Sequence, residues 1–584
     1  AGGPLLFYPS FTIFMAMKRV FCIFFAIACT LSGATRMHAQ KEHRALIFPV
    51  EFSDLKFSIA AETIDSLAAE LTDYFNHQFS DSVKFRFDTA PVWSSGSGYA
   101  QFGRNASYKR DALAYRLALT AYRSNYGSID FSLYDNDHDG FINDIIFLTP
   151  GISEQAGGGE DQFWPAYTEL EDKDIPSSLR FKLKGFALLS EFGADSTLTG
   201  IGLAAHEFGH ILGLKDLYDS DGEDSGGVHA GLGQTSLMAH GLENDCYNTP
   251  PNMNAIEREL LGCGFCEILD TAGAYTLEPI HLNGHYFKIP TYTEGRYYLL
   301  ENRSAEGNDA FIGGSGMLIY RVDMSEEAAG YSTYFQRTLS SLERWKYNQV
   351  NCNPEFPCAE IIPAEADSAD TSLMFWPQAG RNIFSPGRIA VTDIARNGSD
   401  ISFKTVLPLT IDGTSVFQSS AIVTWNISED LGPVDSCKLE WSSQNSILGK
   451  ADGTPLGGNR YSYTIKGLSP HTTYHYTASV YYSDGSSYSA DGSFTTRIYR
   501  SGVFRFIWLG DVPRNVNGSF KKGSAIPLIV YNCVEEDIEW TFNGRAVKPG
   551  SDGMWTVPQS GTLKAEISNA DGSKDVIIKE IIAE

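Results

Sequence analysis

The residues from Thr199 to Asp216 constrain the fold more than any other stretch of this chain. They predict a buried helix from about Thr199 to Leu212, because most positions between those ends are apolar. His206 and His210 are four residues apart, so their imidazoles stand on one face of the helix, one turn above the other. Two imidazoles in that arrangement can bind the same tetrahedral zinc ion.

Three further residues extend the pattern. Glu207 lies beside the histidines, where it can hold a water molecule next to a metal and act as general base. Gly213 is expected to end the helix, because glycine tolerates the left-handed backbone conformation found there. The chain then doubles back and brings Asp216 toward the metal as candidate third ligand, with the fourth position open for water. The alternative is a buried helix with two hydrogen-bonded histidines, but the glycine and the acid at their offsets favour zinc.

A second segment, Ser236-Leu237-Met238, follows the predicted helix. A motif of the form HExxHxxGxx(H/D) followed by such a methionine resembles the metzincin clan, where a Met-turn forms the floor under the metal. The longer runs HEFGHILGLKDLYD and SLMAHG resemble the immune inhibitor A family of secreted bacterial metalloproteases. That family carries Asp in place of the third metzincin histidine. The resemblance implies an α/β (α+β) metzincin-like protease domain with zinc as catalytic cofactor.

The reaction implied is hydrolysis of peptide bonds in extracellular proteins by a zinc-activated water. Zinc is held by His206, His210 and Asp216, and Glu207 takes a proton from the water and passes it to the leaving amine. His240 lies two residues after Met238 and could donate to the negative charge on the tetrahedral intermediate. The alternative role for His240 is a hydrogen bond within the turn.

Two other functions stay open. One is a zinc hydrolase that acts on a non-protein amide or ester, since HExxH specifies the water chemistry and not the substrate. The other is a non-catalytic surface adhesin on a protease scaffold, although the intact Glu207 argues against it. Neither the natural substrate nor the preferred bond follows from the sequence.

The N-terminal residues are expected to be removed before the protein acts. Residues 1–16 are interpreted as upstream or non-native sequence, and residues 17–39 as a secretory signal peptide cleaved after Ala39. Its apolar run, Val20–Ala28, is too short to span a bilayer. A lipoprotein signal with Cys29 acylated is the alternative. We therefore expect a secreted or cell-surface protein.

Composition agrees with export. Lys and Arg number 45 against 71 Asp and Glu, which gives a net charge of −26. Such a balance excludes a general nucleic-acid binder and suits a soluble protein that holds Ca²⁺. We expect no transmembrane segment in the mature chain, and a monomer whose partners are protein or peptide substrates.

Calcium is predicted at a D-x-D-x-D-G segment, where alternate carboxylates converge on one hard cation. The expected ligands are three carboxylates, one backbone carbonyl and a further carboxylate, in the order Asp135, Asp137, Asp139, Phe141 and Asp144. The loop differs from an EF-hand because position twelve is Ile146 instead of Glu. A polar turn is the alternative. For a second acidic cluster, calcium and a solvated loop are both open: Asp219, Asp221, Glu223 and Asp224.

Cysteine pairing is expected in an oxidising compartment. Cys352 and Cys358 bracket a short loop and are expected to pair, whereas Cys246 could pair with Cys263 or Cys266. Beyond the leader an odd number remains, so at least one thiol is left free. The full set is Cys246, Cys263, Cys266, Cys352, Cys358, Cys437 and Cys533.

A chain of 584 residues is too long for one core, and several domains are expected. Arg44–Phe52 is predicted to be a buried strand and Ile64–Gln78 an amphipathic helix. Near Tyr474, the run GLSPHTTY resembles the tyrosine corner of a fibronectin type III domain. The predicted division is 41–268 zinc protease, 269–407 family-associated β-rich domain, 408–497 fibronectin type III-like domain and 498–584 immunoglobulin-like β-sandwich.

Overall fold

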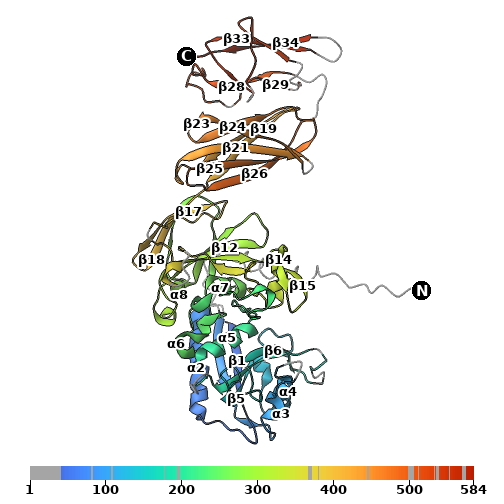
Figure 1. Cartoon of the computed structure of the whole chain (residues 1–584), viewed down its shortest axis with the longest axis vertical. Helices are drawn as coiled ribbons and strands as arrows, with labels where there is room; N and C mark the ends of the chain where they lie inside the picture. The colour runs from blue at the N-terminus through green and yellow to red at the C-terminus, as the bar shows by residue number, and fades with distance from the viewer. Residues whose placement is uncertain are drawn as a thin grey trace, which may run out of the picture.

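The computed structural model describes residues 41–79, 83–106, 110–171, 173–175, 178–193, 198–365, 371–378, 380–443, 446–497, 505–510, 512–531, 533, 538–550, 553–568 and 574–584. The predicted signal peptide, its cleavage after Ala39 and the alternative at Cys29 lie outside these residues. The molecule is elongated, with the first sheet at one end, a β-rich region in the middle and two β modules at the other end (Figure 1). Within the described part of the chain, no helix is both long and apolar enough to cross a membrane.

The first sheet has the strand order β2-β1-β5-β8-β6, with β3 paired to β1. Its neighbours are parallel except for β6, which runs antiparallel at one edge. The strands are β1 (Lys41–Glu51), β2 (Val83–Thr89), β3 (Trp93–Ser94), β5 (Ile145–Ile152), β6 (Ala166–Glu169) and β8 (Gly185–Phe192). The predicted strand at 44–52 corresponds to β1, which begins three residues earlier and ends at Glu51.

Both faces of this sheet are covered, which agrees with the apolar runs at residues 45–50 of β1, 145–148 of β5 and 186–189 of β8. Ala45 and Ile47 of β1 point into a core shared with helices α2 (Ala61–Phe79) and α5 (Ile201–Ile211). The alternate residues Leu46 and Phe48 point into a second core that includes helix α4 (Ala114–Ser124). The sheet thus fixes the position of α5 from one side.

The β-rich region contains two main sheets, of order β16-β13-β12-β11-β9 and β10-β18-β17. Their strands are β9 (Phe265–Ile268), β10 (Gly273–Leu277), β11 (His285–Pro290), β12 (Arg296–Arg303), β13 (Gly316–Asp323), β16 (Ala359–Ile361), β17 (Ala390–Asn397) and β18 (Asp400–Val406). The core that holds α2 and α5 continues across residue 268 into this region, because Leu299 and Trp345 belong to it. The first sheet and the β-rich region therefore share one hydrophobic core.

A buried ionic network also joins these two regions. Arg303 of β12 is fully buried and binds Glu301 at 3.0 Å and Asp309. The same guanidinium donates to the backbone carbonyls of Thr235 and Asn252, at 3.1 and 3.0 Å. A charge this deep is stable only when paired and fully hydrogen-bonded. The network fixes the segment before Met238 against the β-rich region.

The fibronectin-like module is a sandwich of two four-stranded sheets, β19-β20-β24-β23 and β22-β21-β25-β26. They are built from β19 (Leu409–Val416), β20 (Ala421–Ile427), β21 (Val434–Ser443), β22 (Ser446–Asp452), β23 (Thr454–Gly457), β24 (Arg460–Ile465), β25 (Thr473–Tyr482) and β26 (Ser487–Thr495). Trp425 is fully buried between the sheets, and the Tyr474 hydroxyl accepts from the Ser469 backbone N–H at 2.9 Å. The predicted tyrosine corner is thus formed.

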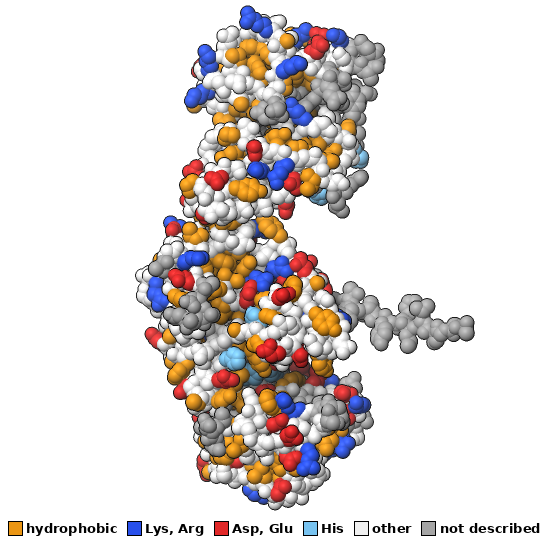
Figure 2. Space-filling view, viewed as in Figure 1, with side chains coloured by type: hydrophobic (Ala, Val, Ile, Leu, Met, Phe, Trp, Pro, Cys, Tyr) orange, Lys and Arg blue, Asp and Glu red, His pale blue; other side chains and the backbone are white. Residues whose placement is uncertain are grey.

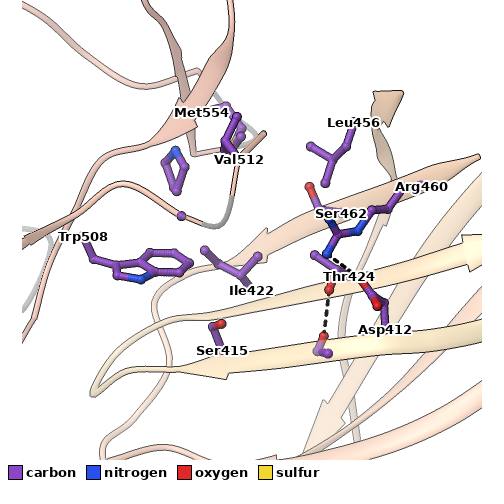
Figure 3. A pocket seen from close by; sticks show the side chains of 13 residues that line it. Asp412, Ser415, Ile422, Thr424, Leu456, Arg460, Ser462, Trp508, Val512 and Met554 are labelled. Carbon is purple, nitrogen blue, oxygen red and sulfur yellow. Dashed lines mark hydrogen bonds and ion pairs between the residues drawn. The ribbon is translucent and has the colours of Figure 1, made fainter. Parts of the chain in front are cut away.

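The last module contains a four-stranded sheet of order β31-β30-β33-β34 and two two-stranded pairs, β27-β29 and β28-β32. The strands are β27 (Ile507–Trp508), β28 (Ala525–Pro527), β29 (Ile529–Val530), β30 (Ile538–Phe542), β31 (Arg545–Ala546), β32 (Met554–Thr556), β33 (Gly561–Ser568) and β34 (Lys574–Ile581). A cavity of about 180 Å³ lies where it meets the fibronectin-like module. Figure 3 shows Trp508 on one side of this cavity and the Asp412–Arg460 ion pair on the other.

The expected disulfides are not formed. None of the cysteines from Cys246 to Cys533 that the structure describes forms a disulfide, which corrects the pairing of Cys352 with Cys358. The Cys352 sulfur lies 3.3 Å from the Ser220 hydroxyl, while the Cys358 thiol donates to the Phe356 carbonyl at 3.7 Å. Closeness in sequence did not bring the two sulfurs together, because each packs against a different neighbour.

Candidate metal centre

Helix α5 carries the two predicted histidine ligands. It begins after Gly200, whose backbone is extended, and is two residues shorter at its N-terminus than the sequence predicts. Gly200 has no room for a side chain there, since a Cβ would stand 2.2 Å from the Tyr247 carbonyl oxygen. Past the helix, Gly213 has φ +105°, the left-handed region expected of a residue that turns the chain back.

The structure brings His206, His210 and Asp216 together. One Asp216 carboxylate oxygen, Oδ1, lies 3.3 Å from Nε2 of His206 and 3.2 Å from Nε2 of His210. All three side chains offer ligand atoms within 4.8 Å of one another. The arrangement has two nitrogen donors and one oxygen donor, which suits zinc.

Backbone carbonyls orient both imidazoles. Nδ1 of His206 lies 3.0 Å from the Leu237 carbonyl oxygen, and Nδ1 of His210 lies 3.1 Å from that of Leu214. A carbonyl can only accept, so each Nδ1 carries the proton and donates it. Each Nε2 is then the atom presented to the centre, as in metal sites whose histidines are fixed by outer partners.

The charges at the centre are strongly coupled. Burial lowers the pKa of His206, but the Asp216 carboxylate, the negative charge of Glu207 and the Leu237 carbonyl together outweigh burial and raise that pKa to about 9. Burial raises the pKa of Asp216, and the two histidines outweigh it and hold that pKa far below its usual range. The buried carboxylate of Asp216 therefore stabilises positive charge at this centre.

Glu207 meets the same centre with an unsatisfied oxygen. Its side chain is only 4% exposed, and burial raises its pKa. Glu207 Oε2 and Asp216 Oδ1 are both buried without a hydrogen-bond partner among the described residues. Orphaned buried acceptors are costly unless something binds them. A divalent cation with an attached water would satisfy both atoms, so the residues fit zinc.

Met238 lies directly beneath α5. Its side chain is fully buried, and a Cβ added at Gly209 would stand 2.7 Å from its sulfur. The Met238 backbone N–H donates to Glu257 Oε1 at 3.0 Å, and its carbonyl accepts from Leu217 N–H at 2.7 Å. Glu257 also lies in the first turn of helix α7 (Ala255–Leu261), where it completes the capping box with the N-cap residue Asn254, so it anchors the turn to a second helix.

His240 is at the surface rather than beside the ligands. Its side chain is 53% exposed, and its Nδ1 lies 3.7 Å from Glu243. Tyr218 stands between His240 and the centre, with its ring 6.0 Å from the His240 ring and 6.3 Å from the His206 ring. Burial first, and then the negative charges of Asp216 and Glu207, raise the pKa of Tyr218, which keeps the phenol protonated.

Sequence reasoning missed two residues of this centre. Tyr218 was visible in the run DLYD but had no assigned role. Asn348 is 132 residues from Asp216, yet its side-chain amide donates to Asp216 Oδ2 at 2.6 Å and accepts from Asp216 N–H at 2.7 Å. No spacing rule in the sequence could have found Asn348, because it comes from the β-rich region. On the face shown in Figure 2, a surface hollow lies between that region and the first sheet, and pale-blue histidine side chains border it.

The predicted calcium loop is partly assembled. Asp135, Asp137 and Asp139 offer oxygens within 4.8 Å of one another. Phe141 begins strand β4 (Phe141–Ile142) directly after them. Asp144, however, binds elsewhere: one oxygen lies 2.8 Å from Nε2 of His43 and the other accepts from the Asn136 amide at 2.8 Å. Asp144 is therefore not grouped with the three carboxylates.

The second acidic cluster is smaller than the sequence suggests. Asp219 and Asp221 come within 4.8 Å of each other and of the Cys352 sulfur. Glu223 and Asp224 do not join that group and are exposed. Asp219 accepts from the backbone N–H groups of Asp221, Gly222 and His229, so one of these carboxylates organises the loop itself.

Known proteins match two parts of the chain. Residues 114–262 match the family described as the Immune inhibitor A peptidase M6 catalytic domain, and residues 408–495 match the fibronectin type III domain. These matches support a metalloprotease with a fibronectin-like module behind it. The M6 segment contains α5, Asp216 and Met238.

Individual relatives agree over limited stretches. The pre-pro-metalloprotease PrtV of Vibrio cholerae serotype O1 is 24% identical over 210 residues, which cover 31% of this chain and 23% of PrtV. Immune inhibitor A of Bacillus thuringiensis subsp. alesti is 29% identical over 93 residues, 15% of this chain and 14% of that protein. The chain thus spans less than a quarter of either relative.

Among solved structures, the fibronectin(III)-like modules of Clostridium thermocellum CbhA align with 30% of this chain and 94% of theirs at 13% identity. The TM-score is 0.13, too low to carry any conclusion about fold. The sequence matches are the informative ones. The resemblance expected from the sequence is confirmed: this chain combines a segment similar to the catalytic domain of the immune inhibitor A (M6) peptidases with a fibronectin type III domain.

Proposed function

We propose that this chain is a secreted, zinc-dependent endopeptidase that hydrolyses peptide bonds of extracellular proteins. The observation that carries the proposal is the convergence of His206, His210 and Asp216 beside a buried Glu207 with one unsatisfied oxygen. Zinc bound there would act as a Lewis acid that polarises the peptide carbonyl and makes a neighbouring water more acidic. Because Asp216 is anionic, the centre is one charge less positive than a three-histidine site, which should moderate that acidity.

Glu207 is the proposed general base. Its carboxylate is adjacent to both histidines on α5, and its free oxygen can accept a proton from the attacking water. The raised pKa brings the carboxyl closer to neutral pH, where it can take that proton and then return it to the leaving amine. Glu207 thus serves first as base and then as acid.

Negative charge on the carbonyl oxygen needs a donor, and two side chains are candidates. His240 stands at the offset where some metzincins carry a tyrosine, but it is more than half exposed. Tyr218 is closer to His206 and keeps its phenol protonated, so it can also donate. We propose that His240 is the donor to this oxygen. Tyr218 is the second candidate, and variants of the two residues should be compared.

Other parts of the chain also have proposed roles. Residues 17–39 act as signal peptide, and the loop of Asp135, Asp137 and Asp139 binds a structural calcium ion. The fibronectin-like and immunoglobulin-like modules act as spacers or binding units behind the protease, and the mature protein is a monomer. We propose a division into units 41–268, 269–407, 408–497 and 498–584, of which the first two share a hydrophobic core.

Glu207→Gln in the full chain tests the function. The variant should keep its zinc and its melting temperature but lose about two to four orders of magnitude in casein cleavage, measured by amine release, as expected for a positioned acid–base group. Glu223→Gln is the matched control, since Glu223 is exposed and outside the cluster. Near-normal cleavage by zinc-replete Glu207→Gln would refute the base assignment.

The same assay separates the alternatives. A wild-type protein that ignores casein but hydrolyses small esters or amides would be a different zinc hydrolase. A zinc-loaded wild type with no hydrolysis of either substrate class would favour the adhesin.

A further inference from the structure

A short segment of the β-rich region runs along the loop that carries the third ligand. Three asparagine side chains donate to that loop: Asn348 to Asp216 Oδ2 at 2.6 Å, Asn351 to the Leu217 carbonyl at 2.9 Å, and Asn353 to the Ser225 carbonyl at 2.7 Å. We call residues 348–353 the asparagine clamp. All three hydrogen bonds join the β-rich region to the loop after α5, so this contact is a specific feature of the fold.

Asn348 differs from the other two because it reaches a ligand side chain. Its amide nitrogen donates a hydrogen bond to Asp216 Oδ2, and its amide oxygen accepts a hydrogen bond from the Asp216 backbone N–H at 2.7 Å. With Oδ2 occupied, Oδ1 is the oxygen left to face Nε2 of both histidines, and it has no hydrogen-bond donor of its own. A neutral amide also leaves the full negative charge on the carboxylate.

The backbone around Asn348 is fixed for this contact. Asn348 follows helix α9 (Ser341–Lys346) and has φ +56°, a left-handed conformation that asparagine tolerates better than most residues. Trp345 of α9 donates to the Asp323 carbonyl at 2.8 Å and is buried in the shared core. On the other side, the Asn348 carbonyl accepts from the Ser220 hydroxyl at 3.3 Å.

We propose that Asn348 is a positioning residue for the metal centre, which holds Asp216 so that it binds zinc through Oδ1 alone. The β-rich region is then a working part of the catalytic unit and not an appended module. The proposal rests on the zinc site proposed above and adds to it a residue from outside the segment that matches the M6 family.

The hydrogen bond from Asn348 to Asp216 should affect both the affinity for zinc and its coordination. A carboxylate with both oxygens free can rotate or chelate the metal with two oxygens, whereas the amide selects one oxygen and one orientation. Outer partners of metal ligands typically contribute ten- to a hundredfold in metal affinity. Loss of Asn348 should therefore weaken zinc binding by about that factor and change the coordination of the metal.

The test uses the full chain, stripped of metal and titrated with zinc against a chelator, and separately loaded with cobalt(II) for its visible spectrum. Asn348→Gly removes both hydrogen bonds but suits the left-handed backbone. It should bind zinc about ten- to a hundredfold more weakly, with a cobalt spectrum shifted toward higher coordination. The metal-free melting temperature should change little, because Asn348 is only half-buried. Asn353→Ala, the matched control on the same clamp, should leave both metal readouts at wild-type values.

A second variant keeps the test decisive if Asn348→Gly folds poorly. Asn348→Asp retains the acceptor for Asp216 N–H and replaces only the donor to Oδ2, so an altered cobalt spectrum would support the proposal. Wild-type zinc affinity and spectrum in both variants, or equal losses in Asn353→Ala, would overturn it. Asp216→Ala separates failure of the proposed zinc site from failure of the role proposed for Asn348. If Asp216→Ala too keeps wild-type zinc affinity, the proposed zinc site itself is wrong. If Asp216→Ala loses zinc while Asn348→Gly does not, only the role of Asn348 is wrong.

Discussion

Gly209→Ala is expected to destabilise the part of the chain that contains α5 and the first sheet. In most helices the same change is stabilising. Glycine in a helix interior costs about 1 kcal/mol relative to alanine, so the substitution alone should stabilise α5 by that amount. At this position, however, the new Cβ would stand 2.7 Å from the sulfur of Met238 and 3.5 Å from Leu214 Cδ1. The Met238 backbone is held on both sides by Glu257 and Leu217, so relief must come from its buried side chain.

Overpacking of this kind costs about 1–3 kcal/mol, which offsets the gain in helix propensity. We expect a net loss of up to about 2 kcal/mol. Removing the Met238 side chain should reverse the sign of the change in unfolding free energy that Gly209→Ala causes. Met238→Ala alone should cost about 2–5 kcal/mol through its cavity. In that background Gly209→Ala should stabilise by about 1 kcal/mol, because the clash is gone.

Unfolding of the metal-free wild type, both single variants and the double variant completes a double-mutant cycle. The chain has several cores, so the transition that shifts on zinc addition should be followed as the one that reports on α5. A stabilising Gly209→Ala in the wild-type background, or no coupling with Met238→Ala, would refute the contact between α5 and the turn beneath it.

Four further outcomes are expected. Asp216→Ala should sharply weaken zinc binding while Asp219→Ala does not, as metal analysis of both variants will show; the reverse result would reassign the third ligand. Calcium added to zinc-loaded, calcium-stripped protein should raise the melting temperature, because the three carboxylates of the 135–139 loop otherwise repel one another; no change would leave the loop a polar turn. His240→Ala should lower kcat and kcat/KM together by roughly ten- to a thousandfold with zinc content unchanged. If Tyr218→Phe shows this loss and His240→Ala does not, Tyr218 is the donor. Tyr474→Phe should lower the unfolding free energy of the fibronectin-like module alone by about 1 kcal/mol, because it removes only the acceptor for Ser469 N–H. Calorimetry measures the change in that transition.

Features that depend on local geometry can be predicted from the amino-acid sequence. Four-residue spacing on a helix places His206 and His210 on one face whatever surrounds them. Gly213 turns the chain and Asp216 follows within reach, and the tyrosine corner at Tyr474 closes over only five residues. The alternating carboxylates from Asp135 to Asp139 likewise meet because a single turn joins them.

Contacts between residues far apart in the sequence depend on the tertiary fold and could not be predicted. Asp144 was expected to complete the calcium loop, yet it pairs with His43, 101 residues earlier, because β1 and β5 are neighbours in the sheet. Cys352 and Cys358 lie close in sequence but pack against different partners. Asn348 reaches Asp216 across 132 residues through a core that two regions share. Such contacts depend on sheet register and on packing between regions, and neither leaves a periodic signal in the sequence.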